Sequence, residues 1–158
     1  MPTQVRSHRR IAALAVALIL PNATLATAKD LLALAELLVS AYTAMDFAVV
    51  CATRQPSFLL ETAGPLGNVL NYAEHVRDEA VESLAHDEAL IVLKTAADAA
   101  RATVLQTIRK FQTGEQSLEA ARIRAWCSTD ATDFIRTFMN EYDRDHDKFL
   151  ETLKRSKR

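Results

Sequence analysis

The stretch that decides the fold is "LLALAELLVSAYTAMDFAVV", residues 31–50. It is apolar almost all round, and its few polar residues recur at intervals of four, three and three, which places them on one narrow stripe of a helix. A helix with so little polar surface must be contacted on several sides, so we expect it at the centre of the fold. The polar stripe consists of Glu36, Ser40, Thr43 and Asp46.

The rest of the chain has the same helical character. Only three glycines occur in 158 residues, and apolar residues recur at spacings of three and four rather than alternating. These features predict an all-α protein, an antiparallel bundle of four to five helices that forms a single domain over residues 29–158. Asp30 is expected to cap the first helix of this domain, which should end near Ala52.

Two interruptions are predicted in the middle of the chain. The sequence "GPLG" at residues 64–67 is the clearest break, and it should end a short helix that starts at Pro56. An unbroken helix over residues 68–111 would be about 66 Å long. We therefore expect an interruption at residues 86–87, with Asp87 capping the helix that follows. Its buried face is predicted to contain Leu90, Leu93, Ala97, Val104, Ile108 and Phe111.

The last part of the chain contains one glycine and one cluster of capping residues. Gly114, within "QTGEQ", should turn the chain before a helix over residues 116–127. A break is expected at "STD", residues 128–130, where Asp130 can cap the final helix. The predicted buried face of that helix consists of Phe134, Ile135, Phe138, Tyr142, Phe149 and Leu153.

The N-terminal segment has the layout of a secretory signal peptide. Arginines at positions 6, 9 and 10 precede ten uninterrupted apolar residues, 11–20, and small residues follow at 26–28. The apolar run is shorter than the ~20 residues that cross a bilayer. We therefore interpret residues 1–28 as a secretory signal cleaved before Lys29, with a buried core helix as the alternative. The pair at 9–10 also leaves twin-arginine export open.

Cleavage would leave a periplasmic or secreted protein with two cysteines and no stable membrane-spanning helix. In an oxidising compartment we expect Cys51 and Cys127 to form a disulfide, with two independent buried thiols as the alternative. Closing a loop of about 77 residues would stabilise the fold by about 4 kcal/mol in the chain-entropy model.

The charge of the predicted mature chain argues against nucleic acid as a partner. Removing three of the 19 basic residues leaves 16 against 20 acidic ones, a net charge of −4 with histidine neutral. Binding to nucleic acid requires clustered cations. The one basic cluster, residues 154–158, is interpreted as a solvated tail, with contact to anionic lipid or to a partner as the alternative.

One group of side chains has the spacing of a metal site. His75, Glu79, Glu82 and His86 follow one another at intervals of four, three and four, which aligns them on one helical face. Two imidazoles and two carboxylates in register can bind a transition metal, within one chain or at a symmetric contact between two copies. An ordinary polar face is the alternative interpretation, and no cofactor is assigned.

Two further polar patterns are weighed on the same basis. Asp143, Asp145 and Asp147 match the first positions of a calcium loop, but lysines occupy the positions that require Gly and Glu, so we predict a helix there.

Asp46 lies in the apolar first helix and is predicted to form a buried ion pair with Arg101, or else with Arg124. Two separately exposed charges are the alternative.

These observations favour a non-catalytic function. The chain has no Gly-x-Ser-x-Gly nucleophile motif, no Cys-x-x-Cys-His haem motif, and too few glycines for a phosphate loop. We expect an exported helical protein that binds a protein partner, such as a stress-related factor or an inhibitor or immunity-type factor, with a homodimer as a further option. A metal-binding bundle and a small periplasmic enzyme are the alternatives.

Overall fold

The secondary structure is helical throughout the computed structural model, which describes the backbone of residues 25–156 and the side chains of residues 30–138 and 146–155. Within that range there is no β-strand. Five α-helices are present, and a short π-helical segment, η3, joins the last two. The elements are α1 (Leu25–Arg54), α2 (Ser57–Ser83), α3 (His86–Arg109), α4 (Gln116–Trp126), η3 (Cys127–Ala131) and α5 (Thr132–Ser156).

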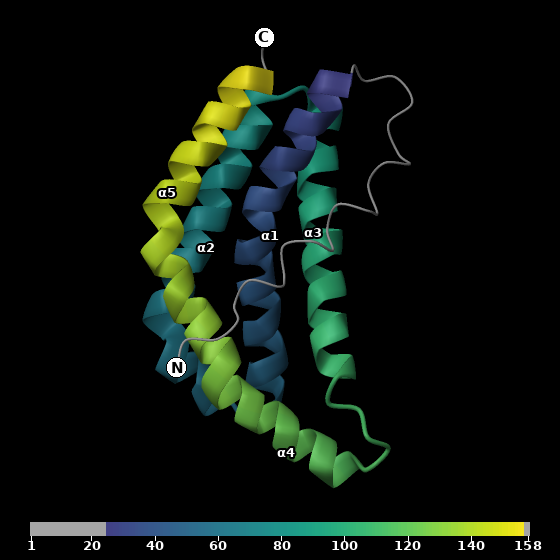
Figure 1. The fold of residues 1–158 in the computed structure, drawn as a ribbon. Helices are drawn as coiled ribbons and strands as arrows, with labels where there is room; N and C mark the ends of the chain where they lie inside the picture. The colour runs from purple at the N-terminus through teal and green to yellow at the C-terminus, as the bar shows by residue number, and fades with distance from the viewer. Residues whose placement is uncertain (1–24, 157–158) are drawn as a thin grey trace, which may run out of the picture.

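The helices form the predicted antiparallel bundle. Figure 1 shows α1 and α3 running in one direction, while α2 and the continuous rod of α4, η3 and α5 return in the other. Helix α1 contacts α2, α3 and α5, and α2 also packs along α5. The turn between α3 and α4 contains Gly114, as predicted, and its φ of +82° is one that side-chain-bearing residues rarely adopt.

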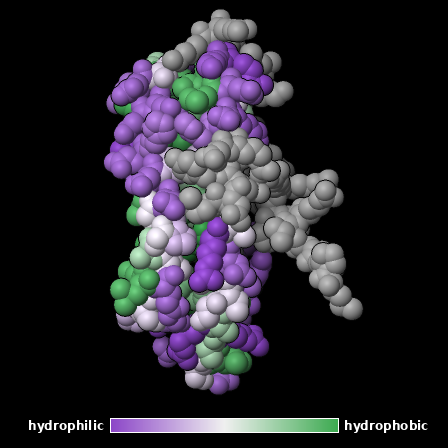
Figure 2. Space-filling view, turned by 90° about the vertical axis from the view of Figure 1, so that its left-hand side faces the viewer, coloured by the Kyte–Doolittle hydropathy of each residue, from purple (hydrophilic) through white to green (hydrophobic). Residues whose placement is uncertain are grey.

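Helix α1 is the central helix, as its composition predicts. Leu34, Leu38, Ala41 and Ala44 are fully buried, whereas Glu36 on the polar stripe is exposed. Residues 30–54 are also long and apolar enough to cross a membrane. However, α1 is enclosed by three helices, and the face seen from the α5 side is mostly hydrophilic, with hydrophobic residues in small separate groups (Figure 2). Its apolar composition is therefore that of a core helix.

Helix α1 begins earlier than predicted. Its first residue is Leu25, so Asp30 lies inside the helix and does not cap it. The preceding sequence "LATAK" contains neither glycine nor proline, so nothing in it stops a helix. The predicted signal peptide, residues 1–28, lies outside the described residues except for the backbone of residues 25–28.

The predicted break at residues 64–67 is wrong. Helix α2 continues through this sequence with Pro65 in its interior. On both sides of the proline, the same face of the helix is buried, with Phe58 and Thr62 before it and Val69 and Tyr72 after it. Burying a large apolar side chain stabilises by about 1.5–3 kcal/mol, so several such contacts offset a cost of about 3 kcal/mol for an internal proline.

The interruption between α2 and α3 is confirmed, but its cap differs from the prediction. The chain leaves the helical conformation at Leu84, and Ala85 is the N-cap of α3. Asp87 lies within the first turn, and the Ala85 N–H donates a hydrogen bond of 3.2 Å to Glu88 Oε2. A carboxylate that reaches back to the cap N–H fixes the helix start without a capping side chain at the N-cap itself.

The buried face of α3 is shifted from the predicted one. Leu90 is 51% exposed and Ala97 is also exposed, whereas Val104 is buried as predicted. Leu93, Ile108 and Phe111 are partly buried. Small residues allow α3 to approach α1 closely, so packing turns the alanine-rich face inward in place of the larger side chains. The residues that are buried on α3 are Ala89, Val92, Ala96, Ala100 and Val104.

The predicted disulfide between Cys51 and Cys127 is present and fully buried. It joins the last turn of α1 to the first residue of η3, with 5.5 Å between the two Cα atoms. Beside it, the ring of Trp126 meets the ring of Phe47 edge-on, with 4.7 Å between their centroids. The bridge and this aromatic pair together fasten the lower end of the bundle in Figure 1.

The predicted break at residues 128–130 is also wrong. The chain forms the π-helical segment η3 there, and Asp130 is an exposed residue within it rather than a cap. Thr132 Oγ1 donates a buried hydrogen bond of 2.8 Å to the Cys127 carbonyl, five residues back. A π-helical turn shifts the helix face that follows it. Trp126 before the segment and Ile135 after it are thus both buried.

Reduction of the disulfide should destabilise the fold strongly. Because the bridge closes a loop with a sequence separation of 76, we expect the free energy of unfolding to fall by about 4 kcal/mol in the chain-entropy model. Urea denaturation of the oxidised and the dithiothreitol-reduced protein, followed by circular dichroism, measures this without changing any side-chain volume. A difference below ~1 kcal/mol would contradict the assigned role of the bridge.

The turn between α3 and α4 should give a pH-dependent contribution to stability. Glu119 Oε1 accepts hydrogen bonds from the Thr113 and Gly114 N–H groups, at 2.7 and 2.8 Å, and these bonds lower the pKa of Glu119. Because the pKa of Glu119 is lower in the folded state, the ionised carboxylate stabilises the fold at pH values above its ordinary pKa of 4.5. This stabilisation is lost as the pH falls through the folded-state pKa.

The matched variant for this effect is Glu119→Gln, which keeps the side-chain shape and removes the charge. We expect urea denaturation to find the wild type more stable than the variant at pH 7, and this difference to shrink toward zero at pH 3. A difference that is the same at both pH values would argue against the ionised carboxylate as the cause.

Candidate functional site

An open apolar groove lies between the C-terminal half of α1 and the N-terminal half of α2. Its volume is about 420 Å³, and every lining side chain is apolar except that of Thr53. The groove therefore has the chemistry of a surface for apolar side chains rather than of a catalytic pocket with convergent polar groups. Its main lining residues are Met45, Val49 and Ala52 of α1, and Leu59, Leu66 and Leu70 of α2.

The rim of this groove exposes large apolar side chains. Of the lining residues, Val49 is 63% exposed, Leu59 is 44% exposed and Leu70 is 45% exposed. Single exposed apolar residues are common on proteins, but a contiguous set around a hollow is typical of an interaction surface.

A second feature is a cluster of two histidines and one glutamate, formed where α2 packs on α5. His75 Nε2 lies 3.2 Å from Glu79 Oε1, and His146 Nε2 lies 3.4 Å from Glu79 Oε2. The centroids of the two imidazole rings are 4.8 Å apart. The carboxylate of Glu79 is therefore held between two imidazole nitrogens from different helices.

The cluster is supported from below by the core and is open on one side. The Tyr72 side chain is fully buried, and its ring stacks edge-on with the rings of Phe138 and His146, with 5.3 and 6.5 Å between centroids. The side chain of His75 is 52% exposed, whereas those of Glu79 and His146 are only 22% and 21% exposed. Solvent can thus reach the cluster beside His75.

The predicted histidine and glutamate stripe is only partly brought together. His75 and Glu79 are adjacent, but Glu82 and His86 are both exposed and neither belongs to the cluster. For His86 the reason is the interruption at residues 84–85, because His86 starts a new helix and no longer continues the face of α2. His146 takes their place, and the helix predicted at residues 143–147 was the only sequence signal for it.

The predicted buried ion pair between Asp46 and Arg101 is not formed. Asp46 is half-buried, Arg101 and the alternative Arg124 are exposed, and the ion pairs among residues 30–138 and 146–155 include none of the three. Asp46 avoids the cost of burying a charge because it remains partly hydrated at the edge of α1, and therefore needs no buried partner.

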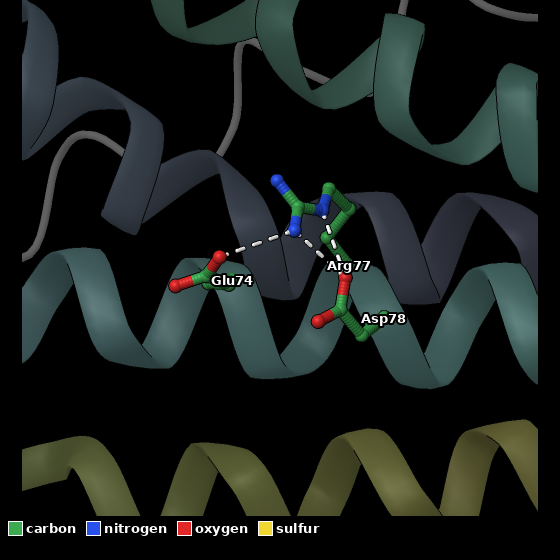
Figure 3. A network of polar contacts seen from close by, with 3 residues as sticks. All are labelled: Glu74, Arg77 and Asp78. Atoms are coloured by element: carbon green, nitrogen blue, oxygen red, sulfur yellow. Dashed lines mark hydrogen bonds and ion pairs between the residues drawn. The ribbon is translucent and has the colours of Figure 1, made fainter.

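An exposed ion-pair network on α2 lies next to the histidine cluster in the sequence. The Arg77 guanidinium contacts Asp78 at 2.8 Å and Glu74 at 3.4 Å (Figure 3), and its hydrogen bond to Asp78 raises the pKa of Arg77. Burial raises the pKa of Tyr42 on α1, and the charge of Arg77 partly opposes this. Neither carboxylate belongs to the cluster of His75, Glu79 and His146.

The groove and the cluster use different faces of α2. Leu70 of the groove and His75 of the cluster are five residues apart, which separates them by about 140° around the helix.

Comparison of the chain with protein-family models, with curated proteins and with solved structures gives no match.

Proposed function

We propose that this is an exported, non-catalytic helical protein that binds a partner protein through the groove between α1 and α2. The observation that carries the proposal is the groove itself, which is apolar, open and lined by exposed side chains such as Val49 and Leu70. Leaving such side chains in water is unfavourable, and covering them with a partner would remove that cost.

Export is supported by two features of different origin. The N-terminal segment has the arginines, the apolar run and the small residues of a secretory signal. A buried disulfide persists in the oxidising environment of the periplasm or the extracellular space and is rare in the cytosol. Cleavage after Ala28 would leave nearly all of α1, including every buried residue described above.

The occupant of the groove is proposed to be an amphipathic helix of the partner. Two helices that border an apolar groove accept the apolar face of a third helix, which presents side chains at intervals of three and four residues. Asp46 precedes Val49 by one turn of α1, is half-buried, and has no ion-pair partner within the described residues. A lysine or arginine beside the partner's apolar face would pair with it.

Site-specific photo-crosslinking in the producing cells tests this proposal. A photoreactive amino acid at Val49, in the groove, is compared with one at Leu105, which is 51% exposed on α3 and outside the groove. We expect an adduct from position 49 that maps to an amphipathic, basic-flanked helix of one partner, and none from position 105. The adduct should be in the exported fraction, with its chain beginning at Lys29.

The charge reversal Asp46→Lys is expected to weaken the position-49 adduct, while Arg101→Glu on α3 should leave it unchanged. Equal labelling from positions 49 and 105, or no adduct from either, would overturn the proposal. An adduct of two copies of this chain would replace the partner helix with a second copy.

A further inference from the structure

We propose that His75, Glu79 and His146 form a binding site for a late first-row divalent metal ion, with Zn²⁺ as its representative. The three residues come from two helices, α2 and α5, and each offers a ligand atom within 4.8 Å of the other two. The inference is independent of the groove, because the cluster lies on another face of α2.

Two distances in the cluster are close to the spacing of ligands around a small ion. Ligands at 2.0–2.1 Å from a tetrahedral Zn²⁺ are separated from one another by about 3.3 Å. The His75 nitrogen lies 3.2 Å from Oε1 of Glu79 and the His146 nitrogen lies 3.4 Å from Oε2, while the three ligand atoms together lie within 4.8 Å of one another. Modest rotations of the side chains would bring all three ligands to one ion, without movement of either helix.

The donor set selects the class of ion. Two imidazole nitrogens and one carboxylate oxygen suit zinc, copper or nickel, whereas calcium and magnesium prefer sites made of oxygen alone. A site with three protein ligands also leaves one position of a tetrahedral ion for water. The half-exposed side of the cluster at His75 provides both the entry path and the place for that water.

One buried oxygen of the cluster would also be stabilised by a cation. Glu79 Oε2 is buried and accepts no hydrogen bond, although His146 Nε2 lies 3.4 Å away. A buried carboxylate oxygen without a hydrogen bond is costly, and a metal ion shared with the two imidazoles would compensate for its lost hydration.

The packing beneath the cluster holds the ligands in place. His75 and Glu79 are one turn apart on α2, and between them Val76 is fully buried in the core. On α5, His146 is followed after three residues by Phe149, which is also fully buried. Because both helices are anchored by these residues, the ligands are presented from a rigid frame, as a selective metal site requires.

Titration of Zn²⁺ into the purified oxidised chain tests the assignment at pH 7.5, by calorimetry and by the histidine ring signals in NMR. We expect one Zn²⁺ per chain, an increase in Tm on binding, and shifts in the ring signals of His75 and His146 but not of His86. His75→Ala should weaken binding by at least about tenfold, since even outer-shell changes around metals cost 10–100-fold.

His86→Ala is the matched control, because His86 is an exposed histidine of the predicted stripe that lies outside the cluster. It should leave the affinity unchanged. His75→Ala is preferred over His146→Ala because half of the His75 side chain is solvent-exposed, so folding is retained. Absence of binding, equal weakening by His75→Ala and His86→Ala, or binding that shifts neither His75 nor His146 would overturn the assignment.

Discussion

The burial of α1 is the constraint on which the rest of the structure depends. An apolar helix of this kind needs neighbours on several sides, and α2, α3 and α5 supply them. The alanine-rich face of α3 approaches it closely, and α2 and α5 then pack on each other along its other side. The disulfide adds a covalent tie at the end of the same helix, between Cys51 and the start of η3.

Both candidate sites follow from this arrangement. The groove lies where α1 and α2 pack side by side, and its lining residues, such as Ala52 and Leu66, come from these two helices alone. The cluster exists because α2 also packs on α5, which brings His146 against Glu79. One helix, α2, therefore contributes to two surfaces of different chemistry, one apolar and one able to bind a cation.

The sequence could predict those features that depend on local patterns. The central position of α1 follows from its composition, and the turn between α3 and α4 follows from Gly114. The disulfide follows from an even cysteine count and the predicted export. In contrast, Pro65 and residues 128–130 carry local signals for a helix break, but the chain stays helical at both places because it packs against α1. No local signal in the sequence indicates that packing would override these breaks.

A local sequence pattern could also not predict which residues form the histidine cluster. His75 and Glu79 belong to one helix face and could be paired from their spacing, but His146 lies 71 residues after His75 in the sequence. Its position depends on the register of α5, which η3 alters by its π-helical turn. The pairing of Asp46 with Arg101 failed for a related reason, because burial of a single charged residue cannot be inferred from its own helix alone.

Hydrogen exchange measured residue by residue tests the central role of α1 most directly. If α1 is the helix on which the others pack, the amides from Leu34 to Ala48 should exchange only through global unfolding, with a protection free energy equal to that from urea denaturation. Earlier exchange of these amides, while α3 and α5 remain protected, would mean that the bundle persists without α1 and would contradict the account.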